Sequence, residues 1–272
     1  MPELPEVETI ARGLRQRLPG LVISSVRCRF TGVIVADAGC FRRSLRGAAV
    51  EGVARHGKYL FLRLSGGLDV AVHLRMTGQV LLLPRRMLPD RHTHLEVFFR
   101  GSGDKLVFRD VRKFGRCELL TGGIGRFVRE KRLGPDALTV KSGHLWSRLQ
   151  GTRRGLKAAL LDQGVLAGLG NIYTDEVLFR CRLSPLHPAA ALTRRQTERL
   201  TETIRELLRE AIRSKGTSIS DYVDPQGASG GFQNVLMVYG RAGSPCPRCG
   251  TAVVKSRVAG RGTWSCPRCQ QG

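Results

Sequence analysis

Four cysteines near the end of the chain place the tightest constraint on how it can fold. They follow the pattern C-x2-C-x16-C-x2-C, formed by Cys246, Cys249, Cys266 and Cys269. Two such knuckles can bring four thiolates around one tetrahedral Zn²⁺ and leave no open coordination position. The other four cysteines are scattered, which favours a reducing compartment over disulfides. We therefore expect one structural zinc ion; iron or a redox dithiol pair is the alternative.

The charge of the chain indicates a polyanionic partner. Lys and Arg number 45 against 22 Asp and Glu, which gives a net charge of +23. A field of this size favours nucleic acid, although a ribosome-like or merely soluble basic protein would also carry it. Between the two knuckles, VVKSRVAGRGTW is predicted to be a basic hairpin whose Arg257 and Arg261 reach phosphates.

The distribution of apolar residues predicts a globular chain outside membranes. The hydrophobic fraction of 42% is near the globular norm. No apolar run approaches the ~18 residues of a membrane span. The N-terminus is acidic and lacks the apolar segment of a secretion signal. We expect a soluble cytoplasmic protein with no membrane contact.

Strand patterns dominate the first half of the chain. Pro5 begins an amphipathic helix, with apolar residues recurring at Val7, Ile10, Leu14 and Leu18 before Pro19-Gly20. Short β-branched or aromatic stretches then follow between residues 21 and 120, separated by glycine-rich turns. In YLFLRL, at 59–64, apolar residues occupy both parities, as in a strand that is largely covered. The short connections leave no room for crossover helices, which predicts an antiparallel sandwich or barrel.

Helical patterns replace strands from about residue 150. One short helix includes Ala158–Leu161, and another follows the glycine-rich turn GVLAGLGN. Thr193 and Gln196 form a capping box for a long helix that is predicted to end near Gly216. The predicted class is α+β multidomain, with a domain at 1–134, a linker at 135–150, a helical domain at 151–235 with a mobile loop at 217–235, and a zinc finger at 236–272.

The start of the chain, MPELPEVETI, can supply covalent chemistry. Removal of Met1 exposes Pro2 as a secondary amine, and an α-amine has a pKa near ~8. Such an amine can attack an aldehyde-like carbon and form an iminium. Glu3 and Glu6 lie close enough in sequence to transfer protons. Taken alone, these residues are more simply explained as a helix start.

The glycine-rich turn carries a second candidate site. Asn171 is predicted to be the N-cap of the following helix, whose free amides favour a phosphate. An ordinary capped helix is the alternative.

Several motifs occur together and in a fixed order: PELPEVE at the start, GKYL at 57–60, HLRMTG at 73–78, DVRKFG at 110–115, GLGNIYTDE at 168–176, VYGRAGSPC at 238–246, and the terminal cysteines. Over essentially the whole chain they resemble the formamidopyrimidine-DNA glycosylase/endonuclease VIII family. The resemblance implies an N-terminal antiparallel β-sandwich flanked by helices, a C-terminal helix–two-turn–helix module and a four-cysteine zinc finger, with DNA held between the lobes.

The resemblance also implies a bifunctional DNA glycosylase and AP lyase that acts as a monomer on double-stranded DNA. It makes Pro2 the nucleophile at C1′ of the damaged nucleoside, and Glu3, supported by Glu6, the general acid and base. Lys58 matches the proton donor of β-elimination, and Arg261 matches the arginine that holds the lesion phosphate and assists δ-elimination. The DNA contacts implied are His73, His92, Arg153, Lys157 and Asn171, with Met76, Arg112 and Phe114 filling the space left by the extruded base.

Two other interpretations fit parts of the pattern. An endonuclease VIII-like enzyme would apply the same chemistry to oxidised pyrimidines, but Leu4 and the Met76, Arg112 and Phe114 set resemble the branch that acts on oxidised purines (8-oxoguanine and formamidopyrimidines). A zinc-ribbon protein that only binds DNA leaves Pro2, Glu3 and Lys58 unexplained.

Overall fold

Helix α1 (Leu4–Arg15) opens the computed structural model, which describes residues 1–219 and 222–271. A reciprocal capping box begins the helix: the Glu3 side chain accepts a backbone N–H of the first turn, and the Glu6 carboxylate accepts the Glu3 N–H at 2.7 Å. Pro5 suits this turn because its missing N–H would have no partner there. Val7, Ile10 and Leu14 are buried, which confirms the predicted apolar face.

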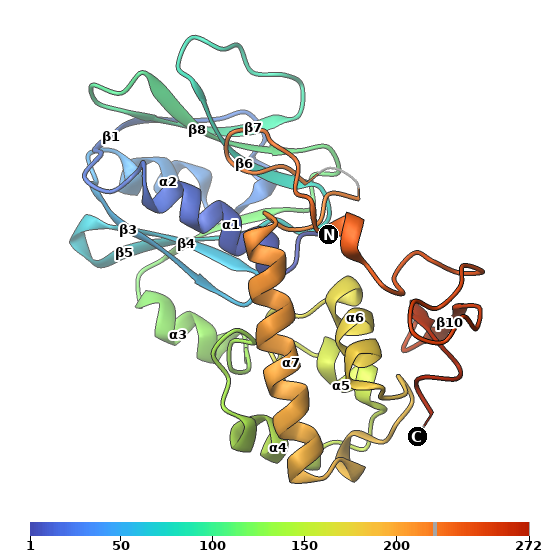
Figure 1. Cartoon of the computed structure of the whole chain (residues 1–272). Helices are drawn as coiled ribbons and strands as arrows, with labels where there is room; N and C mark the ends of the chain where they lie inside the picture. Colours follow the sequence, from blue (N-terminus) through green and yellow to red (C-terminus); the bar gives the residue numbers. More distant parts are fainter. Residues whose placement is uncertain (220–221, 272) are drawn as a thin grey trace. The chain divides into compact units, whose positions relative to one another are not determined.

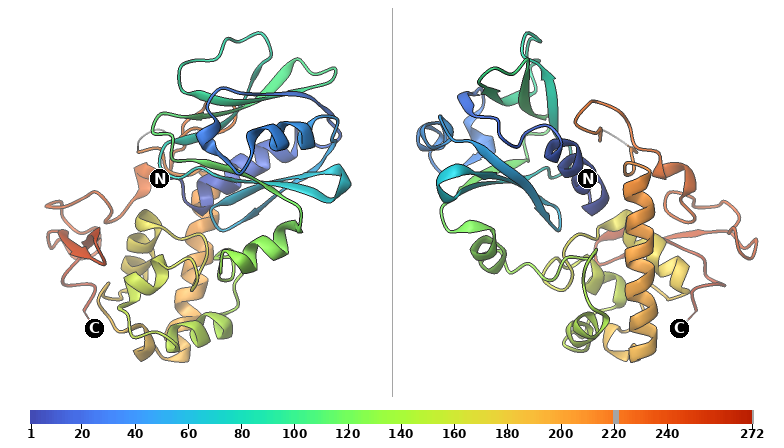
Figure 2. Two further views of the ribbon diagram at one scale, coloured as in Figure 1. Left: turned by 180° about the vertical axis from the view of Figure 1, so that it is seen from behind. Right: turned by 60° about the vertical axis from the view of Figure 1, so that its left-hand side comes forward.

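The chain divides into two units, shown in two further views in Figure 2. The first comprises Met1–Lys131 and Ser214–Gln233, and the second comprises Arg132–Arg213 and Asn234–Gly272. Most of the loop expected within the helical domain thus belongs to the first unit. Ser220 and Asp221 of that loop lie outside the described residues.

Two sheets build the first unit (Figure 1). The larger sheet has the order β2 (Ile34–Val35), β9 (Arg116–Leu120), β5 (Leu68–His73), β4 (Tyr59–Leu64) and β3 (Val50–His56). The smaller has the order β1 (Ile23–Cys28), β7 (Thr93–Phe99), β8 (Asp104–Asp110) and β6 (Gly78–Pro84). The described pairs are antiparallel except the two-residue β2, which runs parallel to β9. The predicted sandwich is confirmed.

Strand β4 is apolar on both faces because both faces are covered. Leu60 and Leu62 point into the core between the sheets. Phe61 points to the other side, where Phe127 of helix α3 (Gly123–Glu130) packs edge-on with ring centroids 5.6 Å apart. A strand that is covered on both sides loses the polar alternation of a half-exposed strand.

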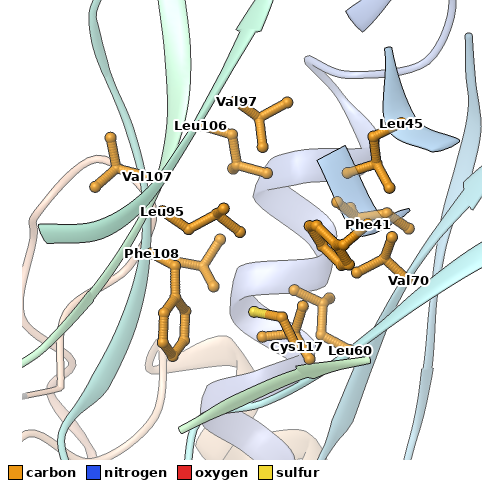
Figure 3. Close-up of a pocket in the computed structure, with 13 residues that line it drawn as sticks. Phe41, Leu45, Leu60, Val70, Leu95, Val97, Leu106, Val107, Phe108 and Cys117 are labelled. Atoms are coloured by element: carbon orange, nitrogen blue, oxygen red, sulfur yellow. The ribbon is translucent and has the colours of Figure 1, made fainter. Parts of the chain in front are cut away.

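The core between the sheets encloses a cavity of about 30 Å³. Apolar side chains from both sheets and from helix α2 (Ala38–Leu45) point into it, as Figure 3 shows. Phe41, Leu45 and Cys117 are among the residues that line it. An apolar cavity of this size stays dry and is too small for a substrate. The functional site must therefore lie elsewhere.

Helices build most of the second unit. They are α4 (Ser142–Gln150), α5 (Leu156–Leu161), α6 (Asn171–Cys181) and α7 (Arg194–Arg213). The predicted capping box begins α7, with Thr193 N–H donating to Gln196 at 2.9 Å and Gln196 N–H donating back at 3.2 Å. The helix ends at Arg213, slightly before the predicted end. The segment between α5 and α6 completes the helix–two-turn–helix arrangement.

A hairpin and short 3₁₀ turns complete the fold. Strands β10 (Val254–Val258) and β11 (Arg261–Ser265) form the expected basic hairpin, on which Arg257 and Arg261 are exposed. The 3₁₀ turns are η1 (Thr31–Val33), η2 (Ser65–Gly67), η3 (Ala189–Ala191) and η4 (Phe232–Val235). Within the described ranges, every helix is too short or too polar to cross a lipid bilayer.

Candidate functional site

The N-terminal residues Pro2, Glu3 and Glu6 are buried together at the start of α1. Glu6 bridges two segments: one carboxylate oxygen accepts the Glu3 N–H, and the other accepts the Thr217 N–H at 2.8 Å. Gly216 makes this approach possible, since a Cβ there would lie 2.7 Å from the same Glu6 oxygen, and its φ of +81° suits glycine. The Glu6 carboxylate thus fixes both the turn that presents Pro2 and the base of the 214–233 segment.

Glu8, on the same helix, is a structural acid. Its carboxylate accepts hydrogen bonds from Arg12, Arg15 and Arg55 at 2.8–3.2 Å. Burial alone would raise the pKa of Glu8, but the hydrogen bonds of Arg15 and Arg55 outweigh it and lower the pKa below its usual value. Glu8 therefore stays ionised and tied to the sandwich.

Lys58 and His73 lie at one end of the larger sheet. Lys58 is buried in the two-residue turn between β3 and β4, where Gly57 has a φ of +55°, as in a turn with glycine at its first central position. His73 is paired with Tyr59 in the adjacent strand. The sheet register thus brings the two predicted residues together.

His73 is held in its neutral form. Its Nδ1 accepts the backbone N–H of Arg75 at 3.0 Å, which requires an unprotonated nitrogen there. Burial, and then the positive charges of Arg75 and Lys58, lower the pKa of His73 to about 3. The remaining proton lies on Nε2, which leaves a neutral N–H donor for an acceptor such as a phosphate oxygen.

Met76, Arg112 and Phe114 form an exposed cluster. The Arg112 guanidinium lies 3.1 Å from the Met76 sulfur and 4.7 Å from the centre of the Phe114 ring. Met76 is 42% and Phe114 47% exposed, which is unusual for apolar side chains. Apolar side chains that can enter a base stack have to protrude in this way. The structure brings the three predicted residues together.

Asp110, which the sequence did not single out, organises this cluster. Its buried carboxylate accepts hydrogen bonds from the Thr77 hydroxyl and from the N–H groups of Arg112 and Gly115. Its backbone N–H donates to the carbonyl of His92 at 3.0 Å. One carboxylate therefore fixes the Met76 turn and the Arg112–Phe114 turn. The neighbouring Asp90 receives the His92 N–H.

The segment after α7 is packed on the sandwich through the Tyr222 side chain and the Pro225 carbonyl, and Asp224 holds its turn together. Tyr222 is buried in the sandwich core. Asp224 is also buried and accepts the N–H groups of Gln226 and Ala228 at 3.0 and 2.9 Å. Leu82 of β6 donates its N–H to the Pro225 carbonyl at 2.9 Å. The described part of this predicted loop is therefore packed on the sandwich.

The terminal cysteines form the zinc site. All four sulfurs lie within 4.8 Å of one another, with Cys246–Cys269 at 3.9 Å and Cys249–Cys266 at 3.5 Å. A tetrahedron with Zn–S bonds of about 2.3 Å has edges of about 3.8 Å, so the donor set fits one Zn²⁺. Four thiolates fill its coordination sphere, and the ion is structural.

Three of the four remaining candidates in the second unit, Lys157, Asn171 and Arg261, lie at the hairpin turn. Asn171 was expected to be the N-cap of α6, but Gly170 occupies that position, and the Asn171 amide instead donates to the Gly262 carbonyl at 2.9 Å. Lys157 was expected at a phosphate, but its side chain is fully buried and its amino group lies 2.6 Å from Asp175. Arg153 is exposed in the segment before α5, and Arg261 is exposed at the start of β11.

Family models match most of the chain. The formamidopyrimidine-DNA glycosylase N-terminal domain matches residues 1–117, the H2TH domain of the same enzymes matches 133–223, and the zinc finger found in FPG and IleRS matches 243–272. The chain belongs to the formamidopyrimidine-DNA glycosylase family. This confirms the resemblance and the helix–two-turn–helix and zinc-finger modules expected from the sequence.

Individual members of this family are similar over their whole length. The formamidopyrimidine-DNA glycosylase of Heliobacterium modesticaldum is 45% identical over 278 residues, and that of Pelotomaculum thermopropionicum is 42% identical over 275; each comparison covers at least 99% of both chains. A crystal structure of a mutant Lactococcus lactis enzyme, in complex with Fapy-dG-containing DNA, matches with a TM-score of 0.93 at 35% identity over all of both chains. A complex of the Lactococcus lactis enzyme with abasic-site DNA gives 0.92.

Proposed function

We propose that this member of the formamidopyrimidine-DNA glycosylase family excises oxidised purines, such as 8-oxoguanine and formamidopyrimidines, from double-stranded DNA and then nicks the strand. The observation that carries the proposal is the buried N-terminal group Pro2–Glu3–Glu6, an acidic cluster in a chain of net charge +23. A capping box alone would explain Glu3 and Glu6, but an enzyme that acts on the sugar also requires acids beside its nucleophile, and Pro2 lies in the same buried group.

The first step forms a covalent bond. After removal of Met1, the Pro2 nitrogen attacks C1′, the C1′–N bond breaks, and the base leaves with the proton that the Pro2 nitrogen gives up. Glu3 supplies a proton to the sugar ring oxygen, which opens the ring and forms an iminium between Pro2 and C1′. Glu6, held by the N–H groups of Glu3 and Thr217, keeps this turn in place.

The iminium then drives strand cleavage. It acidifies the C2′ proton, so the 3′ phosphate leaves by β-elimination and the 5′ phosphate follows by δ-elimination. Lys58 provides positive charge and a proton at the leaving 3′ phosphate, and Arg261 provides positive charge at the leaving 5′ phosphate. Hydrolysis of the iminium returns the free Pro2 amine. His73 and Asn171 contribute N–H donors to the backbone phosphates, and His92 and Arg153 further contacts.

Extrusion of the damaged base precedes the chemistry. Removing a base from the stack costs a few kcal/mol. The exposed cluster of Met76, Arg112 and Phe114 can occupy the resulting space. We also propose that the enzyme acts as a monomer in the bacterial cytoplasm, where the chromosome lies.

Borohydride trapping tests the proposal. Reduction of the iminium should leave a covalent adduct between the processed chain and a duplex that contains 8-oxoguanine opposite cytosine. Inserting one alanine between Met1 and Pro2 converts the Pro2 nitrogen into an amide and should abolish the adduct while DNA binding persists. A duplex with an oxidised pyrimidine should react far more slowly. Binding without any adduct would support the zinc-ribbon binding protein instead, and preference for the pyrimidine would support the endonuclease VIII-like enzyme.

A further inference from the structure

Two adjacent acids on α6 hold the zinc-finger segment at two separate points. Asp175 accepts the N–H of Trp264, in strand β11, at 3.0 Å. Glu176 accepts the N–H groups of Met237, Val238 and Tyr239 at 2.9–3.1 Å, just before the first knuckle. Both acids are at most 1% exposed. Buried carboxylates that receive several N–H bonds form rigid attachments because any movement leaves a charge unsolvated.

Lys157 adds a third attachment at the turn of the hairpin. Its amino group lies 2.6 Å from Asp175 Oδ1 and donates to the Gly262 carbonyl at 3.0 Å. The Asn171 amide donates to the same carbonyl at 2.9 Å. Gly262 directly follows Arg261. The carbonyl next to that arginine therefore accepts one hydrogen bond from Lys157 of α5 and one from Asn171 of α6. An amide group has two hydrogens, so Asn171 can also donate to a second acceptor.

The zinc ion cannot provide this attachment. It joins the two knuckles, Cys246–Cys249 and Cys266–Cys269, whereas the turn between β10 and β11 lies at the opposite end of both strands. A two-stranded hairpin has little stability of its own in water. The direction of Arg261 therefore depends on what holds the turn, and Lys157 and Asn171 both hold Gly262 there.

We infer that Lys157 and Asp175 are positioning residues that set Arg261 and Asn171 side by side, ready to bind one backbone phosphate between them. This inference rests on the proposed function. Neither residue touches the substrate: Asp175 orients the Lys157 amino group, and Lys157 with Asn171 fixes the Gly262 carbonyl. The buried ion pair has a defined geometry, so it fixes the position of the Lys157 amino group more closely than an apolar contact would.

The test uses the full chain and a duplex that contains a tetrahydrofuran abasic analogue, which cannot be cleaved. The variant Lys157→Met with Asp175→Asn removes both charges and keeps an acceptor for the Trp264 N–H. We expect binding at least ~10-fold weaker and a salt dependence reduced by about one phosphate contact. In an Arg261→Ala background the same pair of substitutions should change Kd less than about twofold, since the contact is already lost. On a cleavable duplex, β-elimination products should rise relative to β,δ-elimination products.

Matched controls separate positioning from stability. Glu210→Gln removes the Arg180–Glu210 ion pair between α6 and α7 and should leave Kd and the salt dependence unchanged. Zinc content and thermal unfolding establish that each variant is folded. Should the double variant not fold, Lys157→Met alone answers the same question, because burial raises the pKa of Asp175 and the carboxyl can take up a proton once Lys157 is gone, which leaves no unpaired buried charge.

The inference is overturned if a folded, zinc-loaded variant binds like the wild type, or if its loss of affinity is the same with and without Arg261. Borohydride trapping by the wild-type chain decides the proposed function separately. If borohydride traps the wild-type chain but the loss of affinity does not depend on Arg261, the proposed function stands and only the positioning role is wrong.

Discussion

The Glu6 carboxylate accepts the backbone N–H of Thr217, a residue 211 positions further along the chain, at 2.8 Å. Through this bond the first turn of the protein, which carries the proposed nucleophile, and the segment that follows α7 share one side chain. Because the other Glu6 oxygen accepts the Glu3 N–H, the two attachments use one carboxylate and cannot be altered independently.

Glu6→Gln should therefore loosen the segment after α7. Glutamine offers one acceptor oxygen where glutamate offers two, so either Glu3 N–H or Thr217 N–H faces an amide NH₂ group. Losing a hydrogen bond to a charged acceptor costs about 1.5–3 kcal/mol, which corresponds to amide exchange roughly 10- to 100-fold faster at Thr217. Hydrogen exchange measured by mass spectrometry checks this. Glu130→Gln, which breaks an exposed ion pair with Arg126 in the same unit, is the control, and equal protection of Thr217 in both variants would contradict the bridging role.

His73 should make the stability of the chain depend on pH below neutrality. Its pKa is about 3 in the folded chain and about 6.5 when unfolded, so the unfolded chain binds more protons between these values. The free energy of unfolding therefore falls as the pH drops below about 6.5. Urea unfolding at pH 7.5 and 5.0 should show a loss about 1–2 kcal/mol larger for the wild type than for His73→Gln. Identical losses in both proteins would show that His73 titrates normally.

Asp110→Asn should disturb the Met76, Arg112 and Phe114 cluster without altering its side chains. The amide cannot accept every bond that the carboxylate accepts, so the Gly115 N–H or the pair Thr77 and Arg112 loses its acceptor. We expect a loss of about 1–3 kcal/mol in the free energy of unfolding. Fluorescence of a base analogue placed opposite the lesion should also report slower base extrusion. Asp90→Asn, which removes a surface ion pair with Arg109, is the control. If the Asp110→Asn protein is less stable but extrudes the base at the normal rate, Asp110 contributes to stability and not to base extrusion.

Glu8→Gln should destabilise the first unit by about 3 kcal/mol at pH 7, because it leaves the buried Arg55 without this carboxylate. The pKa of Glu8 is lowered in the folded chain, so its contribution is present above the unfolded value of about 4.3 and is lost as the pH falls below it. The difference between the two proteins in urea unfolding should shrink at pH 3.5. Glu130→Gln breaks an exposed pair with Arg126 and should cost no more than about 0.5 kcal/mol. A constant difference at both pH values would contradict the lowered pKa.

Removal of zinc should weaken DNA binding while the sandwich stays folded. The finger has a small apolar core around Phe179 and Val238, so its fold depends on the metal. Treatment with a chelator should release one Zn²⁺ per chain, lower the affinity for duplex DNA and reduce its salt dependence. Hydrogen exchange of strands β4 and β5 reports the sandwich, because both tryptophans, Trp146 and Trp264, lie in the second unit. Cys40→Ser, an exposed cysteine outside the cluster, should retain full zinc and affinity. Unchanged affinity after complete zinc loss would show that the finger folds without metal.

Sequence reasoning succeeded where the interacting residues are close in the chain. The cysteine spacing predicted the sulfur cluster, because two C-x2-C knuckles can supply four ligands to one metal ion. Thr193 and Gln196 predicted a capping box, because that contact spans only three residues. Apolar residues at both parities of β4 predicted a covered strand, and Phe127 covers it. In each of these cases the local spacing of residue types determines which side chains meet.

Longer-range contacts were not predictable in this way. Asp110 reads as the first residue of DVRKFG, and nothing in that motif indicates that Thr77, 33 residues earlier, donates to it. In the sequence Lys157 looks like an ordinary surface lysine. Only the structure shows that Asp175 of α6 lies beside it and that both side chains are buried. The N-cap of α6 was predicted one position too late, at Asn171, because Gly170 can adopt the extended N-cap conformation as readily. Tertiary contacts decided each of these positions.

The two-part composition of the first unit has a consequence for how the protein is made. Its N-terminal portion ends at Lys131, yet Tyr222, which fills part of its core, lies in the second portion, Ser214–Gln233. About 100 residues must be synthesised after Lys131 before the second portion, and with it the unit, is complete. At a synthesis rate of about 5–20 residues per second this takes roughly 5–20 s, during which the nascent sandwich remains on the ribosome without its last segment. The proposed nucleophile, which is among the first residues to emerge, thus acquires its finished surroundings only when translation is nearly over.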